Sequence, residues 1–519
     1  IELCDIMTVI RILGGTHLLK SYADIMNDIS PDELYKRLLA YGLFTEKLPP
    51  ILSSETFYNY CITLNTPFAD GWRQYIYHES MRNINVPRPL GIPNPMAYQK
   101  LCRCLADNWD KLQTHFSNQT SNQNYKISRI HIRKLGKSNA IFSMSYSNWK
   151  TDGTPEPDLL IGSRYIVRAD ISTCFPSIYT HAIPWALVGK TYAKEHSRKS
   201  DQSEWYNQID HLTQNCKNGE THGLLIGPHA SNLLSELILT VIDKRLYDAG
   251  WRYIRNIDDY TCYVDTYESG QKFLIALGEE LRNFDLSLNF KKTEIEELPV
   301  ASVEQWVRKI NSVSIMQRNG KLDFIGARAY LDSAIELMQT NKMNSAILNY
   351  AIKVLAGQEL TPNAKEYCIK TIFHLCLIYP YLVPLLEKSV FEKFSVSGVE
   401  IENLSQKLFE KGLDEKNYEL ICYALYFSIK YGFEIVKVDP DDAIASNSCL
   451  FKLFAFLYFK KNNNDTANKK MKSHARNLAS NEDDFNRNWL FVYESLPQSD
   501  LKGEWKPLKK AGISFVKYP

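Results

Sequence analysis

Apolar residues follow different spacings in different parts of this chain. In the first two-thirds, short strand-like runs alternate with helical stripes. Residues 165–169 predict a strand, and residues 253–257 and 260–264 predict the two strands of a hairpin. Between them, residues 232–246 place leucine, isoleucine and valine on one helical face, which predicts a long amphipathic helix. This part of the chain is therefore expected to have an α+β fold.

The spacing is helical throughout after about residue 331. Prolines become sparse there, and no strand signal of comparable strength follows. Two polar stretches, residues 115–125 and 460–476, predict surface loops. We expect two domains, an α+β domain over residues 1–330 and an all-α domain of stacked, HEAT-like helices over residues 331–519. The helices expected in the second domain span residues 331–356, 364–387, 402–411, 415–432, 441–460 and 484–495.

Composition and charge narrow the class of protein. Hydrophobic residues make up 45% and charged residues 23%, as in ordinary globular proteins, and no run of apolar residues is long enough to cross a membrane. The first residues lack the order of a signal peptide, and the 11 cysteines include no CxxC pair, so we expect a cytoplasmic protein with reduced thiols. A net charge of +2 counts against a protein that binds along long nucleic-acid duplexes, because such binding depends on neutralising phosphates.

Three aspartates stand where a metal site for nucleotidyl transfer could form. Asp170 ends the first predicted strand, and Asp258 and Asp259 occupy the tip of the predicted hairpin. A strand–helix–hairpin order allows these strands to lie side by side, which would bring the carboxylates together. Nucleotidyl transfer needs two hard cations about 4 Å apart, so we expect two Mg²⁺ ions, with Mn²⁺ as a substitute. Taken alone, an Asp-Asp pair is also a common turn, and an aspartate after a strand also caps helices.

Six segments, in order along the chain, resemble the sequence motifs of reverse transcriptases. In one of them an aromatic residue, Phe175, follows Asp170 by five positions. In another, Asn256 stands two residues before the acid pair, where an aromatic residue is usual. The six segments are RPLGIP at 88–93, DISTCFPSIY at 170–179, GLLIGPHASNLL at 223–234, NIDD at 256–259, LNFKKT at 288–293 and FIG at 324–326.

The resemblance implies a role for each matching residue in a fingers-and-palm polymerase domain. Asp170 and Asp258 would ligate the metal ions, with Asp259 as a looser third acid and the carbonyl of Ile171 as a further ligand. Phe175 would pack under the sugar and leave no room for a 2′-hydroxyl, which favours deoxynucleotides. The expected contacts with the incoming nucleotide are Gly227, Pro228 and Asn232, and those with its phosphates are Lys291, Lys292, Arg88, Arg133 and Lys134.

More narrowly, the chain resembles the bacterial abortive-infection reverse transcriptases of the AbiK type and their prophage-encoded relatives. The resemblance rests on GLFTEKLPP at 42–50, PWAL at 184–187 and a helical region where a polymerase thumb is expected. It implies a phage-defence enzyme of the bacterial cytoplasm that assembles as a homo-oligomer. It also implies synthesis of single-stranded DNA from dNTPs without a template. The product would be attached to a protein hydroxyl, for which Tyr41 is the candidate.

Three other functions stay open at this level. A conventional reverse transcriptase would bind an RNA partner, and its product would follow the RNA sequence. A nucleotidyl cyclase uses a similar palm, although the segments at 223–234 and 288–293 argue against it. In a non-catalytic scaffold the helical domain would carry the function, and loss of Asp258 would have no effect. Asn256 and the lack of a recognisable thumb count against the copying of long templates. They do not count against polymerase chemistry itself.

Overall fold

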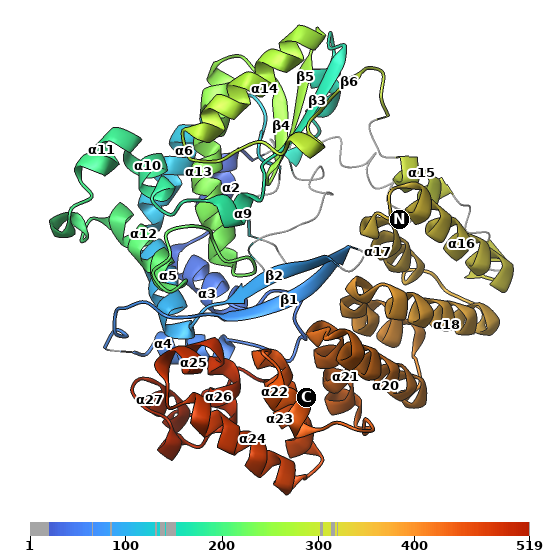
Figure 1. Ribbon diagram of the computed structural model, residues 1–519. Helices are drawn as coiled ribbons and strands as arrows, with labels where there is room; N and C mark the ends of the chain where they lie inside the picture. The colour runs from blue at the N-terminus through green and yellow to red at the C-terminus, as the bar shows by residue number, and fades with distance from the viewer. Residues whose placement is uncertain are drawn as a thin grey trace. The chain divides into compact units, whose positions relative to one another are not determined.

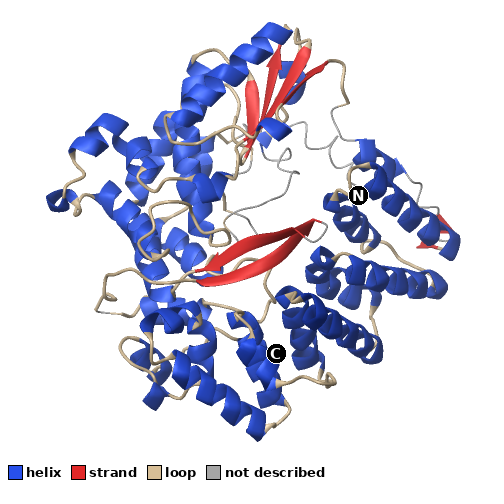
Figure 2. Cartoon of the chain, in the orientation of Figure 1, coloured by secondary structure: helices blue, strands red, loops and turns tan. Residues whose placement is uncertain are grey.

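The fold consists mostly of helices, with three small groups of strands among the described residues (Figures 1 and 2). The computed structural model describes residues 20–517 apart from residues 65, 84–85, 130–131, 135–140, 142–151, 302–304, 313–316 and 319. Close contacts divide the chain into two compact units. We call them the sheet unit, with residues 1–35, 104–207 and 232–299, and the helical unit, with residues 36–103, 208–231 and 300–519.

A four-stranded antiparallel sheet forms the centre of the sheet unit. Its strand order is β4 (Tyr253–Asn256), β5 (Asp259–Val264), β3 (Tyr165–Asp170) and β6 (Glu294–Glu297). The register pairs Asp170 with Asp259, so the end of β3 lies beside the start of β5. The predicted strand and the predicted hairpin are confirmed, and they are neighbours in the sheet.

Two long helices belong to this part of the fold. α13 (His229–Asp248) contains the helix predicted over residues 232–246, and its leucine and isoleucine side chains are buried. α14 (Tyr267–Arg282) packs against β3 and β5. Gly270 permits this close approach, because a Cβ atom there would lie 3.1 Å from the Val167 side chain of β3. The helix and the sheet therefore form one apolar core below the strand ends.

The helical unit is built mainly from helices, although the stretches predicted at 331–356, 441–460 and 484–495 each hold two helices rather than one. α20 (Gly398–Glu415) packs against α21 (Tyr418–Tyr431), and α21 packs against α23 (Cys449–Lys461). In the described residues after β8 (Lys321–Leu322) there is no further strand, so the chain is an α+β protein with a helical C-terminal region. The other long helices of this region are α16 (Phe324–Thr340), α17 (Ser345–Leu355), α18 (Pro362–Ile378) and α24 (Asp465–Leu478).

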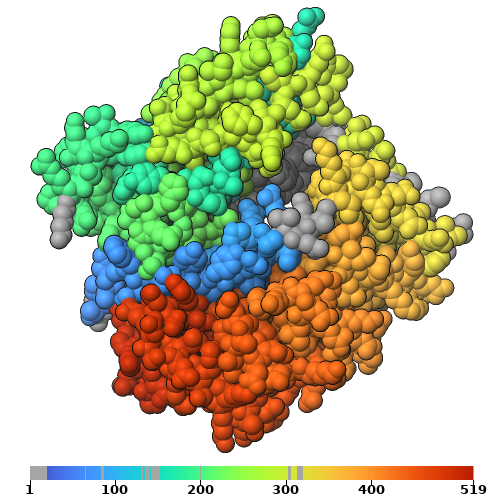
Figure 3. Space-filling model, in the orientation of Figure 1, coloured from blue at the N-terminus to red at the C-terminus, as the bar shows by residue number. Residues whose placement is uncertain are grey.

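A hairpin from early in the chain packs against these C-terminal helices. Its strands are β1 (Ile76–Asn83) and β2 (Val86–Ile92), and β1 contacts α21 and α23. Within the helical unit, the blue atoms of early residues adjoin the orange atoms of the C-terminal helices in Figure 3. The Glu419 carboxylate accepts hydrogen bonds of 2.8 Å from the Ser80 hydroxyl and from the Met81 N–H. A separate domain that begins at residue 331 stays a prediction.

Two stretches that we predicted as loops contain helices instead. α6 (Trp109–Thr120) includes part of the stretch at 115–125, and α24 covers most of the stretch at 460–476. In α24 the buried residues are Ala467, Met471 and Ala475, four positions apart. This stripe is narrow and its side chains are mostly small, so the many polar neighbours concealed the helical period.

The cysteines of the described region are all buried and free of disulfides. Burial raises the pKa of the Cys102 thiol well above its usual value, so this thiol stays protonated at neutral pH. None of the helices in the described part of the chain combines the length and the apolar character that a membrane crossing requires.

Candidate active site

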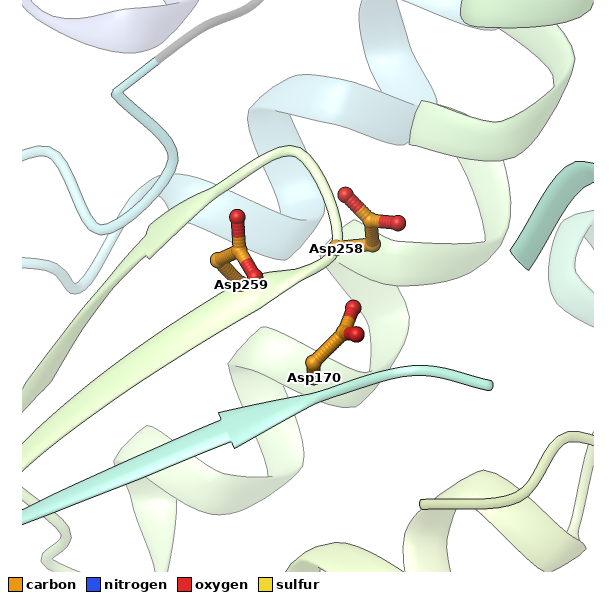
Figure 4. Close-up of side chains that lie close together, drawn as sticks. All are labelled: Asp170, Asp258 and Asp259. Atoms are coloured by element: carbon orange, nitrogen blue, oxygen red, sulfur yellow. The ribbon is translucent and has the colours of Figure 1, made fainter. Parts of the chain in front are cut away.

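The three predicted aspartates come together where β3 ends and the β4–β5 hairpin turns. Asp170 is the last residue of β3, Asp258 lies in the turn, and Asp259 is the first residue of β5. One oxygen atom from each carboxylate lies within 4.8 Å of the others (Figure 4). Asp170 is buried, Asp258 is half-buried and Asp259 is exposed. The cluster is therefore covered by protein at Asp170 and open at Asp259.

The backbone of the turn is tied to β3. The Ile171 N–H donates a hydrogen bond of 3.1 Å to the Asp258 carbonyl. The residue before Asp258, Ile257, has a φ of 61°. Glycine is the usual residue at such a position of a two-residue hairpin turn, because a β-branched side chain is strained in the left-handed region. The conformation of this turn must therefore be stabilised by its surroundings.

Asp170 is also held by the segment that follows α14. Lys292 Nζ lies 2.6 Å from Asp170 Oδ2, and Asn289 donates a hydrogen bond of 3.0 Å to the same oxygen through Nδ2. The Asn289 N–H donates to the Asp170 carbonyl at 2.7 Å. Both predicted lysines are exposed, and Lys292 is the one with an ion pair to Asp170.

This donor set suits a hard divalent cation. Three carboxylates offer oxygen ligands only, which Mg²⁺ and Mn²⁺ favour over the nitrogen and sulfur ligands of softer metals. Ile171, the further ligand that the resemblance implies, is buried directly after Asp170. Burial and the negative charge of Asp258 raise the pKa of the neighbouring Cys174 thiol, so this group stays protonated and adds no charge.

Two further predicted residues belong to the sheet unit with the acids. Phe175 is half-buried in the short helix α9 (Cys174–Ser177), which begins four residues after Asp170. Asn232 is half-buried in the first turn of α13. Both side chains are thus partly accessible, as a contact with a substrate requires, and their roles stay predictions.

The remaining predicted contacts from the motif segments belong to the helical unit. Arg88 is exposed on β2, where it pairs with Ser80 of β1. The Gly91 N–H of the same strand donates a hydrogen bond of 2.9 Å to the Ile226 carbonyl, directly before Gly227 and Pro228. Gly227 has a φ of 127°, which an L-residue rarely adopts. The structure therefore joins the Gly-Pro turn to the hairpin that carries Arg88.

The two other basic candidates contact carboxylates of the sheet unit. Arg133 is buried, and its Nη2 lies 2.8 Å from Asp152 Oδ2. Lys134 lies 2.9 Å from Glu33 and is half exposed. Each residue forms an ion pair with a carboxylate of the protein. A contact of either residue with a triphosphate stays a prediction.

Tyr41 lines a surface pocket of about 160 Å³ in the helical unit. Glu55 and Lys517 also line this pocket and form an ion pair with each other. Burial and the neighbouring Glu55 carboxylate raise the pKa of Tyr41. The phenol is therefore protonated at neutral pH, and it would act as a nucleophile only with help from a base or a metal ion.

Sequence reasoning did not find Arg255, which lies in β4 beneath the turn. Its guanidinium is fully buried and contacts Glu236 and Asp243 of α13. The only sequence signal is a charged residue within the apolar strand YIRN at 253–256. That pattern fits an exposed position on an edge strand equally well, so burial could not be inferred from it.

Three comparisons with known proteins were made, and one of them, with a family model, spans the residues of this site. The family model described as "Reverse transcriptase (RNA-dependent DNA polymerase)" matches residues 86–327. No curated protein matches the chain. Among solved structures, apo telomerase from Candida tropicalis is similar at 12% identity over 70% of each chain, with a TM-score of 0.34. Telomerase from Candida albicans in complex with a fragment of telomeric RNA is similar at 10% identity, over 68% of this chain and 64% of that chain, with a TM-score of 0.28.

Proposed function

We propose that this protein, which carries a reverse transcriptase domain and is a nucleotidyltransferase polymerase, is a phage-defence enzyme that synthesises DNA without a template. One observation carries the catalytic part of the proposal. Oxygen atoms of three carboxylates, at the end of β3, in the β4–β5 turn and at the start of β5, lie within 4.8 Å of one another, and the third carboxylate, Asp259, is exposed. Carboxylates in this arrangement can hold the cations that nucleotidyl transfer needs.

In the proposed reaction a hydroxyl oxygen attacks the α-phosphorus of a dNTP. A new P–O bond forms, the bond to pyrophosphate breaks, and the hydroxyl proton passes to solvent. Asp170 and Asp258 would hold two Mg²⁺ ions, with Asp259 and the Ile171 carbonyl as additional ligands. Such ions, when bound, stabilise the charge on the phosphate and make the hydroxyl a better nucleophile.

The protein's own groups would position the nucleotide. Lys292 already lies beside Asp170, and we assign to it a contact with the phosphates or a proton donated to pyrophosphate. Lys291 and Arg88 are further phosphate contacts in this proposal. Phe175 would pack under the sugar and select deoxynucleotides, and Asn232 with the Gly227-Pro228 turn would line the rest of the nucleotide.

The primer in this proposal is a hydroxyl of the protein itself. Tyr41 is the candidate, because it is half-buried and lines a surface pocket. It directly precedes the segment at 42–50 that resembles abortive-infection enzymes. Gly42 is required in that segment, since an added Cβ atom would lie 2.6 Å from the Leu38 carbonyl oxygen. Single-stranded DNA attached to Tyr41 would be the product.

The biological setting rests on the same resemblance. We infer a homo-oligomer in the bacterial cytoplasm that stops phage growth by abortive infection. The net charge of +2 fits an enzyme that does not follow long duplexes. In sequence, the helical C-terminal region follows the motif segments, where a polymerase that copies long templates would be expected to have a thumb.

A gel assay tests the proposal. Purified protein is incubated with Mg²⁺ and labelled dNTPs, without primer or template, and run on a denaturing gel before and after protease digestion. We expect label on the protein that shifts on digestion and disappears in Asp258→Ala. Tyr41→Phe should remove the label if Tyr41 is the primer, whereas the surface variant Tyr192→Phe should keep it. A wild-type protein that incorporates no label contradicts untemplated synthesis.

RNA-templated reverse transcription is the second candidate function. It is favoured by the description of the matching family, which names an RNA-dependent DNA polymerase. Activity that appears only when RNA and a primer are added, with a product complementary to the RNA, would establish it. A cyclic nucleotide product would instead identify a nucleotidyl cyclase. Full phage resistance in Asp258→Ala cells would identify a scaffold.

A further inference from the structure

A buried ionic cluster lies directly below the turn that carries Asp258 and Asp259. Arg255 is completely buried, and its Nη2 lies 2.6 Å from Asp243 Oδ2. Its Nε donates to the two Asp243 oxygens at 2.9 and 3.1 Å, and its Nη1 lies 3.1 Å from Glu236 Oε2. Both carboxylates belong to α13 and are as inaccessible as the guanidinium.

Two tyrosines complete the hydrogen bonds of this cluster. The Tyr22 hydroxyl donates to Glu236 Oε1 at 2.8 Å, and the Tyr253 hydroxyl donates to Asp243 Oδ1 at 3.1 Å. Burial of two carboxylates around a single cation is costly, and such an arrangement is often no more stable than apolar packing of the same volume. Stability alone is therefore a poor reason for its presence.

Arg255 has a further contact that points to the metal site. Its Nη1 donates a hydrogen bond of 2.8 Å to the carbonyl of Ile257. That carbonyl belongs to the peptide group that leads into Asp258, and Ile257 has the strained φ of 61°. The next carbonyl, that of Asp258, is held by the Ile171 N–H at 3.1 Å. The peptide groups before and after Asp258 are thus each held by a hydrogen bond.

We propose that Arg255 is a positioning residue that sets the place of the Asp258 carboxylate through its hydrogen bond to the Ile257 carbonyl, while Glu236 and Asp243 hold the guanidinium. This inference rests on the proposed function, because it assumes that Asp258 holds a metal ion. A planar guanidinium can contact two carboxylates and a carbonyl at once, whereas a lysine ammonium is a single point of charge. Only arginine can therefore join α13 to the turn in this geometry.

The test needs a variant that folds without the arginine. Arg255→Met alone would leave two buried carboxylates without their cation. In the triple variant Arg255→Met, Glu236→Gln, Asp243→Asn all three charges are removed, and the two tyrosines keep amide oxygens as acceptors. The control for loss of a buried ion pair is Lys430→Met with Glu387→Gln in the helical unit. The triple variant also removes one net negative charge, so Arg255→Lys, which conserves every charge, is the control for that change.

Binding of Mn²⁺, measured by electron paramagnetic resonance with and without a non-hydrolysable dNTP, is the main readout. We expect Mn²⁺ binding to weaken at least about tenfold in the triple variant and to be unchanged in the control, while circular dichroism shows both to be folded. Arg255→Lys should bind with intermediate affinity, because the charge remains and the bond to the Ile257 carbonyl is lost. DNA synthesis should need a correspondingly higher Mg²⁺ concentration.

The possible results separate this inference from the proposed function. A folded triple variant that binds Mn²⁺ as tightly as wild type overturns the role of Arg255, whatever the enzyme synthesises. Wild-type protein that binds no Mn²⁺ beyond the level of Asp258→Ala overturns the metal site itself. Equal weakening in the triple variant and in the control would show a general loss of stability and would also overturn the inference.

Discussion

Two buried carboxylate sites, one in each unit, are stabilised in different ways. In the sheet unit, Arg255 is surrounded by Glu236 and Asp243, so every charged group has a partner of opposite sign. In the helical unit, Glu419 is 2% exposed and accepts hydrogen bonds from neutral donors, the Ser80 hydroxyl and the Met81 N–H. Burial raises the pKa of Glu419 to about 7. Burial raises the pKa of Asp243 as well, but there the Arg255 guanidinium opposes the rise, whereas Glu419 is bonded to neutral groups and changes its charge near neutral pH.

These two arrangements also lie at different structural positions. The Arg255 cluster connects a helix to the turn that carries two of the acids. Glu419 connects the first residues of α21 to the edge of the β1–β2 hairpin, which carries Arg88. Both join a helix to a hairpin on which predicted site residues stand. We infer that the three aspartates need a fixed geometry. The β1–β2 hairpin tolerates a contact with Glu419 whose charge changes with pH.

The largest expected effect is the loss of one acid from the paired cluster. Asp243→Ala should lower the free energy of unfolding by about 3–5 kcal/mol, because Nε and Nη2 of the buried guanidinium lose their acceptors. Urea denaturation followed by circular dichroism measures this change. The surface variant Asp248→Ala on the same helix should change the stability by less than about 1 kcal/mol, since its ion pair with Lys244 is exposed. Equal changes in the two variants would show that Asp243 contributes no more to stability than an exposed aspartate.

A pH titration sharpens the contrast for Glu419. Its pKa in the folded protein lies above the ordinary value of 4.5, so the folded state binds the proton more tightly. Glu419 therefore makes the protein less stable as the pH rises from about 4.5 to about 7, by up to about 3 kcal/mol, with no further change above that. Glu419→Gln should remove this slope.

The difference between wild type and Glu419→Gln is the quantity to measure, by urea denaturation at pH 5, 6, 7 and 8. His78 is buried in β1, the strand that Glu419 contacts, and burial lowers its pKa to about 4. Its contribution to stability has the opposite pH dependence, and it cancels when the two proteins are compared. If the difference in free energy of unfolding does not vary with pH, Glu419 has an ordinary pKa, and the contrast with the Arg255 cluster is wrong.

The smallest expected effect concerns an ion pair of intermediate burial. Lys430 is 30% exposed and pairs with buried Glu387, which also accepts a hydrogen bond from the Tyr426 hydroxyl at 2.9 Å. Lys430→Ala should cost about 1–2 kcal/mol, less than the fully buried cluster and more than an exposed pair. Thermal denaturation at constant pH measures it. A loss of stability as large as that of Asp243→Ala would show that the burial of an ion pair does not determine how much its removal costs.

Local patterns predicted the parts of the site that depend on neighbours in sequence. The strand before Asp170, the hairpin around Asp258 and the helix over 232–246 each follow from the spacing of apolar residues, and all three are present. Spacing failed where the apolar stripe is narrow, as in α24, whose buried residues include two alanines. The resemblance named Lys291 and Lys292 together, and the structure separates them by the contact of Lys292 with Asp170.

The sequence alone determined the secondary structure around the acids and their residue type, because both depend on periodicity and on the chemistry of single side chains. Only the tertiary structure decided which residues meet. It placed Arg255 between α13 and the turn, and it grouped residues 36–103 and 208–231 with the C-terminal helices. The burial of a charge and the partners that compensate it depend on segments distant in sequence, and no local pattern records that pairing.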